Sequence, residues 1–446
     1  MAADSAVSVG DGVKIYQSAI KLFTLSKYEP VGVMVYHTAS ILGYPWETII
    51  KSFRHHLGNR TCPTIADYAK EFRGFLHTNE KGLFNPRLQK MNVLNSAHDE
   101  IIKLLTGVRS KYWEGFPDGK PVVKVLEDAI NAQMGSAGKT NVMDCFEPEF
   151  QTAVMEEYGP DLANLAQTMA SENLNFGIGE ADALEMGRLI AEIANLMVMR
   201  LVRDPKFGNY SGMVFAGFGT DEYLPAMSHI VIDGVLCDHL KWKLEQNISV
   251  EPTGSSVIQP FAQSQMVSTF INGVDPSLRT LGAVGSIRMG VELSELIVNS
   301  IDDLSPERKE HWKGVSRAAA IEAWEKYQDS LSEHIRENHQ YPLQRIIGSL
   351  PKDELAEVAE SMVSLNALKM KVSQAKETVG GPIDVAVITK GDGFIWIKRK
   401  HYFSQELNPH FGANYYRSDE GISAHAGVSK KAPAKSRRKG KTDGLK

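Results

Sequence analysis

Two residues near the start of the chain, Asp4 and Lys21, have side chains that together could support a nucleophile. They lie seventeen positions apart, in short segments separated by turn-forming residues. An ammonium group beside a hydroxyl or thiol lowers the pKa of that group, and a carboxylate can hold the ammonium in place. Considered alone, such a pair is more often a surface ion pair of little energetic value. The pair is a candidate site only if the rest of the chain supports it.

Other candidates for chemistry are weaker. Residues 135–140 (GSAGKT) resemble a phosphate-binding loop, but the two glycines are too close and a helical pattern precedes them, so we expect a turn between helices. His55 and His56 end a predicted helix without a metal-ligand pattern beside them. The cluster Lys398–His401 near Trp396 is expected to be a solvated strand end. The sequence predicts no metal and no organic cofactor, and it predicts free thiols at Cys62, Cys145 and Cys237.

The elements that would position Asp4 and Lys21 begin with strands. Residues 7–25 are turn-rich, with a hairpin-like break at Gly10–Gly12, and Val31–Tyr36 is an apolar, β-branched run typical of a buried strand. The apolar spacing of Thr38–Arg54 predicts a helix directly after that strand. Helical patterns then dominate from residue 58 to residue 200, at 64–76, 88–105, 121–134, 146–169 and 181–200.

Strand patterns return at Gly212–Phe218 and His229–Leu236, and helical patterns follow from residue 260 to residue 376. Two further strands are predicted at Ile383–Thr389 and Phe394–Lys398, around a hairpin signal at residues 390–393. Strands and helices therefore occur in separate blocks. This order predicts an α+β fold with antiparallel sheets rather than a doubly wound parallel sheet.

Several segments resemble the proteasome β-type branch of the N-terminal-nucleophile (Ntn) hydrolases. The stretch Ala2–Ser5 is similar to the AADS signature of those proteins, and Lys21 lies in a stretch similar to their lysine-containing strand. Residues 215–218 and 232–234 resemble the middle hairpin of the family. Gly380–Ile383 resembles the Gly-Gly turn that precedes the last strands. The resemblance implies a four-layer α-β-β-α sandwich, here with a large helical insertion at 58–200.

The resemblance also implies roles for individual residues. In the family an N-terminal Thr, Ser or Cys attacks an amide carbonyl, its own amine is the general base, and the aspartate and lysine support it. Only three residues precede Asp4, so the chain as given is expected to lack that nucleophile and to be inactive. Tyr36 occupies the position that resembles the oxyanion-region glycine, and Lys376 and Val379 replace the aspartate and serine before the Gly-Gly turn.

The C-terminal end of the chain differs in net charge from the rest. Residues 430–446 contain six Lys, two Arg and one Asp, a net charge of +7, so the remainder carries −12 within a total of −5. We expect residues 1–411 to form one Ntn-hydrolase-like domain and residues 412–446 to be a disordered basic tail. Three roles for the tail stay open: a solubilising end, a contact with a polyanion, or a docking peptide for a partner protein. No secretory signal or membrane span is visible, which favours a cytoplasmic protein.

Three functions are compatible with these observations. The first is an Ntn-type peptidase or amide hydrolase acting on a peptide or protein substrate as a homo-oligomer, as the resemblance implies. The second is a noncatalytic scaffold or assembly subunit on the same fold, which the departures at Tyr36, Lys376 and Val379 favour. The third is nucleic-acid binding through the basic tail.

Overall fold

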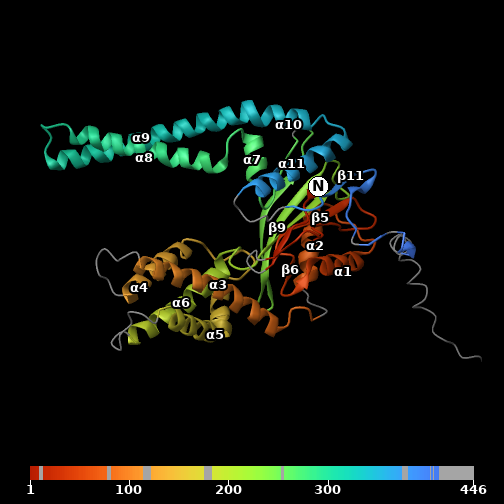
Figure 1. The fold of residues 1–446 in the computed structure, drawn as a ribbon, viewed down its shortest axis with the longest axis horizontal. Coiled ribbons are helices and arrows are strands. Elements are labelled where there is room, and N and C mark those ends of the chain that lie inside the picture. Colours follow the sequence, from red (N-terminus) through yellow and green to blue (C-terminus); the bar gives the residue numbers. More distant parts are fainter. Residues whose placement is uncertain are drawn as a thin grey trace, which may run out of the picture. The chain divides into compact units, whose positions relative to one another are not determined.

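The computed structural model describes residues 1–9, 14–77, 82–113, 122–174, 183–252, 256–373, 380–401, 403–404 and 406–410 (Figure 1). The chain divides into two units, Met1–Lys400 and His401–Lys446. The helices and strands labelled in Figure 1 belong to the first unit. Its sheets are antiparallel and its helices occur in separate blocks, so the α+β class is confirmed.

The larger sheet has five antiparallel strands in the order β10-β9-β8-β5-β4. They are β4 (Leu22–Thr24), β5 (Val31–His37), β8 (Ser211–Gly217), β9 (Ala226–Leu236) and β10 (His239–Ser249). Because side chains alternate along a strand, Val31, Val33 and Val35 point to one face of β5. On this face they share a buried core with helices α1 (Trp46–Leu57) and α2 (Ile65–His77).

The smaller sheet has the order β1-β11-β12 and joins the two ends of the first unit. Its strands are β1 (Ala2–Ala3), β11 (Asp384–Thr389) and β12 (Gly393–Lys398). The two sheets meet at Gly32, where an added Cβ would lie 2.6 Å from a ring carbon of Phe394 and 3.1 Å from Ile388 Cδ1. Helix α11 (Lys352–Val372) packs against β1 and β11.

A second core lies within a group of long helices and is separate from the core under the larger sheet. These helices are α3 (Pro86–Trp113), α4 (Val122–Ala137), α5 (Phe150–Asn173) and α6 (Ala183–Arg203). Each of them contributes fully buried apolar residues, such as Leu105, Leu126, Leu162 and Leu189. The helices predicted between residues 64 and 200 are thus present, with bounds that differ by a few residues except at the end of α3, which extends from the predicted residue 105 to Trp113.

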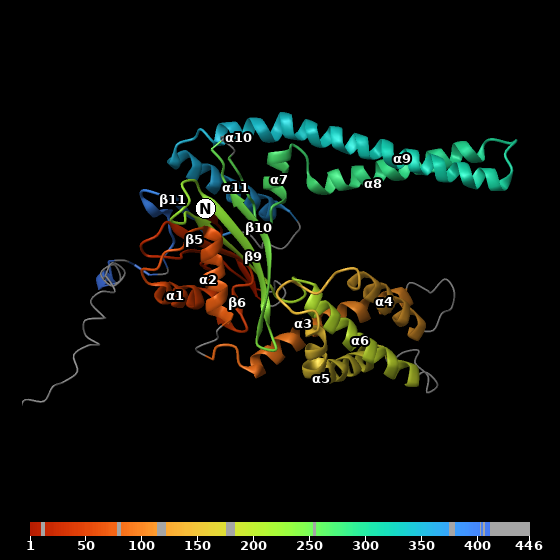
Figure 2. The same cartoon turned by 180° about the vertical axis from the view of Figure 1, so that it is seen from behind.

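The part of the chain that connects β10 of the larger sheet to β11 of the smaller sheet is again helical (Figure 2). It contains α7 (Gln265–Asn272), α8 (Pro276–Asn299), α9 (Pro306–Ile335), a π-helical turn (Arg336–Gln340) and α10 (Tyr341–Ile347). Asp275 caps α8 and Ser305 caps α9, each with a side-chain oxygen that accepts backbone N–H hydrogen bonds, and a proline follows each cap.

Two sequence predictions of local structure were wrong. The helix predicted over Thr38–Arg54 begins only at Trp46, because the chain first forms a tight hairpin of β6 (Ser40–Ile41) and β7 (Tyr44–Pro45). Leu42 and Gly43 in its turn have φ values of 47° and 85°, which a helix does not accommodate. Strand β10 was not predicted, although its apolar residues Leu240, Trp242 and Leu244 alternate as in a strand.

A short hairpin follows β1, formed by β2 (Val7–Val9) and β3 (Lys14–Tyr16). The break at Gly10–Gly12, the positions Lys376 and Val379, and the tail from residue 411 lie outside the described residues. Among the residues that the structure describes, no helix combines the length and the apolar character needed to span a bilayer.

Candidate active site

The structure brings Asp4 and Lys21 together where β1 ends and β4 begins. Lys21 Nζ lies 2.6 Å from Asp4 Oδ1, and the two side chains are 20% and 13% exposed. The other carboxylate oxygen, Oδ2, accepts hydrogen bonds of 3.1 Å from the N–H groups of Ala6 and Gly380. Three donors therefore fix the carboxylate, and the carboxylate in turn fixes the lysine ammonium.

The Gly380–Gly381 turn packs directly on this pair. The N–H of Ser5 donates to the carbonyl of Gly380 at 3.0 Å, so the hydrogen bonding between the two segments is reciprocal. Gly381 has a φ of +77°, and a Cβ there would lie 2.8 Å from Gln17 Cβ. Glycine is required at this turn both for its left-handed backbone and for this close approach.

A second lysine lies on the other side of Ser5. Lys400 Nζ forms an ion pair with Asp384 at 2.7 Å and also hydrogen-bonds the Ser5 hydroxyl, which itself donates to the Pro382 carbonyl. Ser5 is 0% exposed, so its hydroxyl is out of reach of a substrate and acts as a structural link. The sequence predicted solvated charges at 398–401. Lys400 departs from this, because its side chain is only 12% exposed.

Tyr36 lies in β5 beside β8, with its hydroxyl 2.8 Å from His229 Nε2 on β9. Phe261 covers both rings, at centroid distances of 6.0 Å from Tyr36 and 4.9 Å from His229. Burial raises the pKa of Tyr36 to about 12, with smaller contributions from Tyr210 and Glu245. Burial also lowers the pKa of His229, so the neutral tyrosine donates to the neutral imidazole.

The backbone of Tyr36 faces away from Lys21. The neighbouring Val35 donates its N–H to the Lys21 carbonyl at 2.8 Å, across to β4. Because successive N–H groups of a strand point to opposite sides, the N–H of Tyr36 points toward β8, where Tyr36 is in register with Gly212. The structure thus brings Asp4 and Lys21 together but directs the Tyr36 N–H away from that pair.

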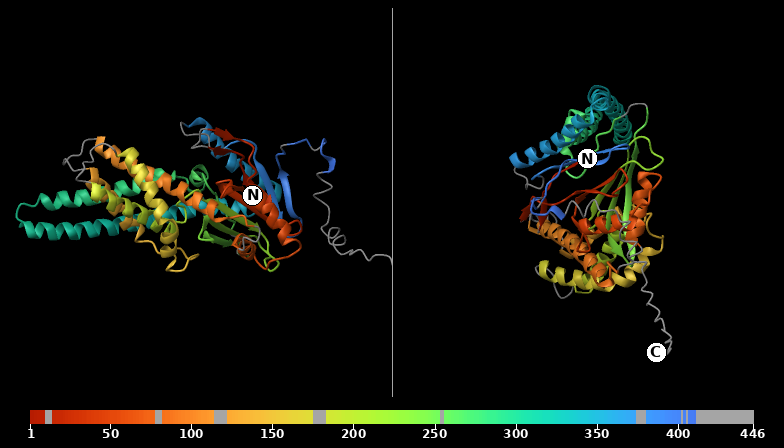
Figure 3. Two further views of the ribbon diagram at one scale, coloured as in Figure 1. Left: turned by 90° about the horizontal axis from the view of Figure 1, so that it is seen from below. Right: turned by 90° about the vertical axis from the view of Figure 1, so that its right-hand side faces the viewer.

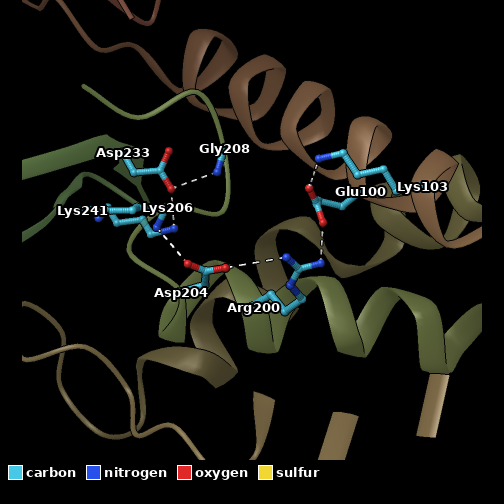
Figure 4. A network of polar contacts seen from close by, with 8 residues as sticks. All are labelled: Glu100, Lys103, Arg200, Asp204, Lys206, Gly208, Asp233 and Lys241. Atoms are coloured by element: carbon cyan, nitrogen blue, oxygen red, sulfur yellow. Dashed lines mark hydrogen bonds and ion pairs between the residues drawn. The ribbon is translucent and has the colours of Figure 1, made fainter. Parts of the chain in front are cut away.

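Sequence reasoning did not find a third cluster, in which Lys241 of β10 is fully buried against Asp233 of β9 (Figure 4). Lys241 Nζ lies 2.6 Å from Asp233 Oδ2, which also accepts the N–H of Gly208 at 3.2 Å. Burial raises the pKa of Asp233, against the lowering effect of Lys241. The only sequence signal was a lysine inside an alternating apolar strand.

Ion pairs continue from this cluster into the long helices (Figure 4). Arg200 of α6 bridges Glu100 of α3 at 2.5 Å and Asp204 at 3.6 Å, and Lys103 also reaches Glu100 at 2.6 Å. The Lys241–Asp233 pair is thus buried, whereas the network becomes more exposed at Asp204 and Lys103, which are 39% and 69% exposed.

Comparison with known proteins does not assign a family, because no protein-family model, curated protein or solved structure matches the chain. Within the described residues, no group of three or more His, Cys, Asp or Glu side chains is arranged to hold a metal ion.

Proposed function

We propose that this chain has the four-layer Ntn fold of proteasome β-type proteins and is related to amide and peptide-bond hydrolases, whose N-terminal nucleophile the described residues do not include. The observation that carries the proposal is the convergence of Asp4, Lys21 and Gly380. Three segments separated by up to 376 positions meet at one carboxylate, with distances of 2.6 Å and 3.1 Å. The sequence resemblance assigns these same segments to the supporting residues and the closing turn of the family site.

The arrangement of layers also supports the proposal. Helices α1 and α2 pack on the outer face of the five-stranded sheet, whose inner face meets the three-stranded sheet at Gly32. Helix α11 contacts the strands of the smaller sheet. These contacts support the layer order helix, sheet, sheet, helix that we propose for the fold.

In the proposed reaction, the Lys21 ammonium would lower the pKa of a neighbouring hydroxyl or thiol. This group would attack the amide carbon, the amine would leave with a proton, and water would hydrolyse the acyl intermediate. The Asp4 carboxylate would hold the ammonium in place. The nucleophile in this family opens the strand that precedes the AADS segment, and the described residues do not include one. Ser5 does not replace it, because its hydroxyl is buried.

A second candidate is a noncatalytic scaffold on the same fold. The specific observation in its favour is the crowding around Tyr36: a Cβ at Gly212 would lie 2.0 Å from the Tyr36 ring, and Phe261 covers the other side. A bulky ring then occupies space where a substrate carbonyl would be bound. Nucleic-acid binding through the basic tail stays a prediction, because the tail lies outside the described residues.

The experiment combines N-terminal sequencing of the protein isolated from its native source with a screen of fluorogenic peptide amides. We expect a Thr, Ser or Cys at the mature N-terminus and a loss of hydrolysis of at least about a hundredfold in Lys21→Met, typical of a lost catalytic group. Lys398→Met is the matched control, since it removes an exposed ion pair with Glu360. Absence of hydrolysis in the isolated protein would favour the scaffold, whereas full activity in Lys21→Met would refute the role given to Lys21.

A further inference from the structure

Helices α8 and α9 form a long antiparallel hairpin whose two members lie side by side (Figure 3). Hydrogen bonds and an ion pair connect the two helices along their length. Trp324 Nε1 donates to the Ala283 carbonyl at 3.1 Å, and the Arg279 guanidinium donates to Ser332 Oγ at 2.9 Å. Arg317 forms an ion pair with Glu295. One face of α8 therefore packs against α9.

The opposite face of α8 is apolar and open. Its large side chains are more than half exposed: Leu278 61%, Leu281 68%, Met289 67%, Leu293 57% and Leu296 65%. The spacings of three, eight, four and three positions place them along one stripe of a helix. At 1.5 Å per residue the stripe is about 27 Å long. These five residues are here called the α8 stripe.

The α8–α9 hairpin buries few apolar side chains of its own. We therefore expect the α8 stripe to be covered by a partner. Of the described residues in α8 and α9, only Val298 and Ile335 are buried. Long helices draw most of their stability from packing an apolar face, and monomers seldom expose a continuous apolar strip of this length.

The charges beside the stripe indicate what covers it. Arg288 and Glu292 are 77% and 58% exposed, lie four positions apart on the same flank of the stripe, and form an ion pair of 2.7 Å with each other within α8. If a second α8 packs antiparallel on the first, with the two-fold axis near residue 290, Arg288 of each copy faces Glu292 of the other. A parallel arrangement would instead place Arg288 beside Arg288. The stripe with its two charges is therefore self-complementary in one orientation.

We propose that a second copy of this chain docks on the α8 stripe, so that the two α8 helices pack antiparallel about a two-fold axis near residue 290, with the α9 helix of each copy on the outer side. In this dimer the Met289 side chains of the two copies approach each other beside the two-fold axis, offset by about 3 Å in the direction of the helices. The Leu278 side chains lie at opposite ends of the interface, about 36 Å apart in the direction of the helices. The proposal rests on the surface of α8 alone and does not depend on catalysis.

The test uses single cysteines in the intact chain and a short bis-maleimide crosslinker. Met289→Cys is expected to form covalent dimers at micromolar concentration, while Leu278→Cys, similarly exposed on the same stripe, is not. The unaltered chain, with its own three cysteines, is the blank. Equal crosslinking of both variants would indicate a parallel or nonspecific contact and would overturn the proposal, as would a monomer in sedimentation equilibrium at all concentrations.

Charge variants test the orientation. Arg288→Glu alone and Glu292→Arg alone are each expected to weaken the dimer at least about tenfold, because like charges then face each other. An equimolar mixture of the two variants is expected to restore the dimer, since one chain then presents two acidic side chains at these positions and the other presents two basic ones. Failure of the mixture to associate would contradict the antiparallel pairing. Leu184→Glu, at a 90% exposed position on α6, controls for a general loss of apolar surface.

Other occupants give distinct results. If the stripe binds a lipid surface instead, the chain sediments with phosphatidylcholine and phosphatidylglycerol vesicles and Met289→Glu abolishes this, which would overturn the proposal. If the second copy is the occupant, Met289→Glu yields a monomer with unchanged helix content by circular dichroism, and the unaltered chain does not sediment with the vesicles.

Discussion

Asp4 accepts a hydrogen bond of 3.1 Å from the backbone N–H of Gly380, a residue 376 positions further along the chain. The same carboxylate holds the ammonium of Lys21 at 2.6 Å. One side chain thus joins the first strand, the strand that follows Lys21, and the turn before the last two strands. The bond geometry makes Asp4 a stability determinant as well as a candidate site residue.

Replacing Asp4 by Ala should lower the free energy of unfolding by about 1–3 kcal/mol, because Lys21 and two backbone N–H groups lose their acceptor. Urea unfolding followed by circular dichroism measures the change. Glu47→Ala is the control, since Glu47 pairs with Lys51 on an exposed helix face and should contribute less than about 1 kcal/mol. Equal losses in the two variants would show that the Asp4 contacts are not formed.

Lys241→Met should destabilise the protein by about 3–5 kcal/mol, because it leaves the Asp233 carboxylate buried without its partner. The double variant Lys241→Met with Asp233→Asn should lose less, since no buried charge remains and the amide oxygen still accepts from Gly208. If the double variant loses as much unfolding free energy as the two single variants, Lys241→Met and Asp233→Asn, lose together, this explanation is wrong.

The loss of folding stability caused by Lys241→Met should also depend on pH. Burial raises the pKa of Asp233 above its ordinary value of 3.8, so between that value and the raised pKa the native state binds more protons than the unfolded state. Stability falls as pH rises through this window. The loss caused by Lys241→Met is therefore expected to be larger at pH 8 than at pH 4.5, as measured by urea unfolding at both values.

Acidification should weaken the contact between Tyr36 and His229. The pKa of His229 is lowered by burial and, to a lesser degree, by Lys206, while Glu245 opposes the shift. Below pH 6.5 the unfolded state therefore binds more protons, and stability falls as pH decreases, by at most about 1.4 kcal/mol per pH unit. His229→Gln should remove this part of the slope between pH 7.5 and 5.5. An unchanged slope in the variant would assign the acid sensitivity to other groups.

Gly32→Ala should destabilise the contact between the two sheets by about 1–3 kcal/mol, because the new methyl group would overlap the Phe394 ring. Phe394→Leu in the same chain should recover part of this loss. Gly107→Ala in helix α3 is the control, since nothing lies within 4 Å and alanine favours a helix. If Gly32→Ala is as harmless as the control, the sheets do not meet at this residue.

The sequence predicted most helices and the α+β class, because apolar spacing is a local property of the chain. It did not predict the hairpin before α1, where the backbone conformations of Leu42 and Gly43 outweigh a helical apolar pattern. For strand β10 the alternation of Leu240, Trp242 and Leu244 was visible, but seven charged or polar residues in the same strand obscured it.

Within the candidate site, the pairing of Asp4 with Lys21 was predicted from the resemblance alone. The contact of Tyr36 with His229 joins residues 193 positions apart and leaves no periodic signal in the sequence. The burial of Lys241 and Lys400 was equally invisible, because a lysine inside or beside a strand is ordinarily solvated. Each lysine is buried because its ammonium pairs with a carboxylate that is distant in sequence or on a neighbouring strand, Asp233 for Lys241 and Asp384 for Lys400.

Strand β1 pairs with β11 through Ala2 and Val385, so β1 finds its partner only in a segment that is synthesised much later. At about 5–20 residues per second, synthesis of the intervening chain takes roughly 20–80 seconds. During that time β1 has an unpaired edge, and the apolar inner face of β4 and β5 has no sheet to cover it. The smaller sheet therefore forms only after β11 has been synthesised, and until then the nascent chain is a predicted client of chaperones that shield exposed strands.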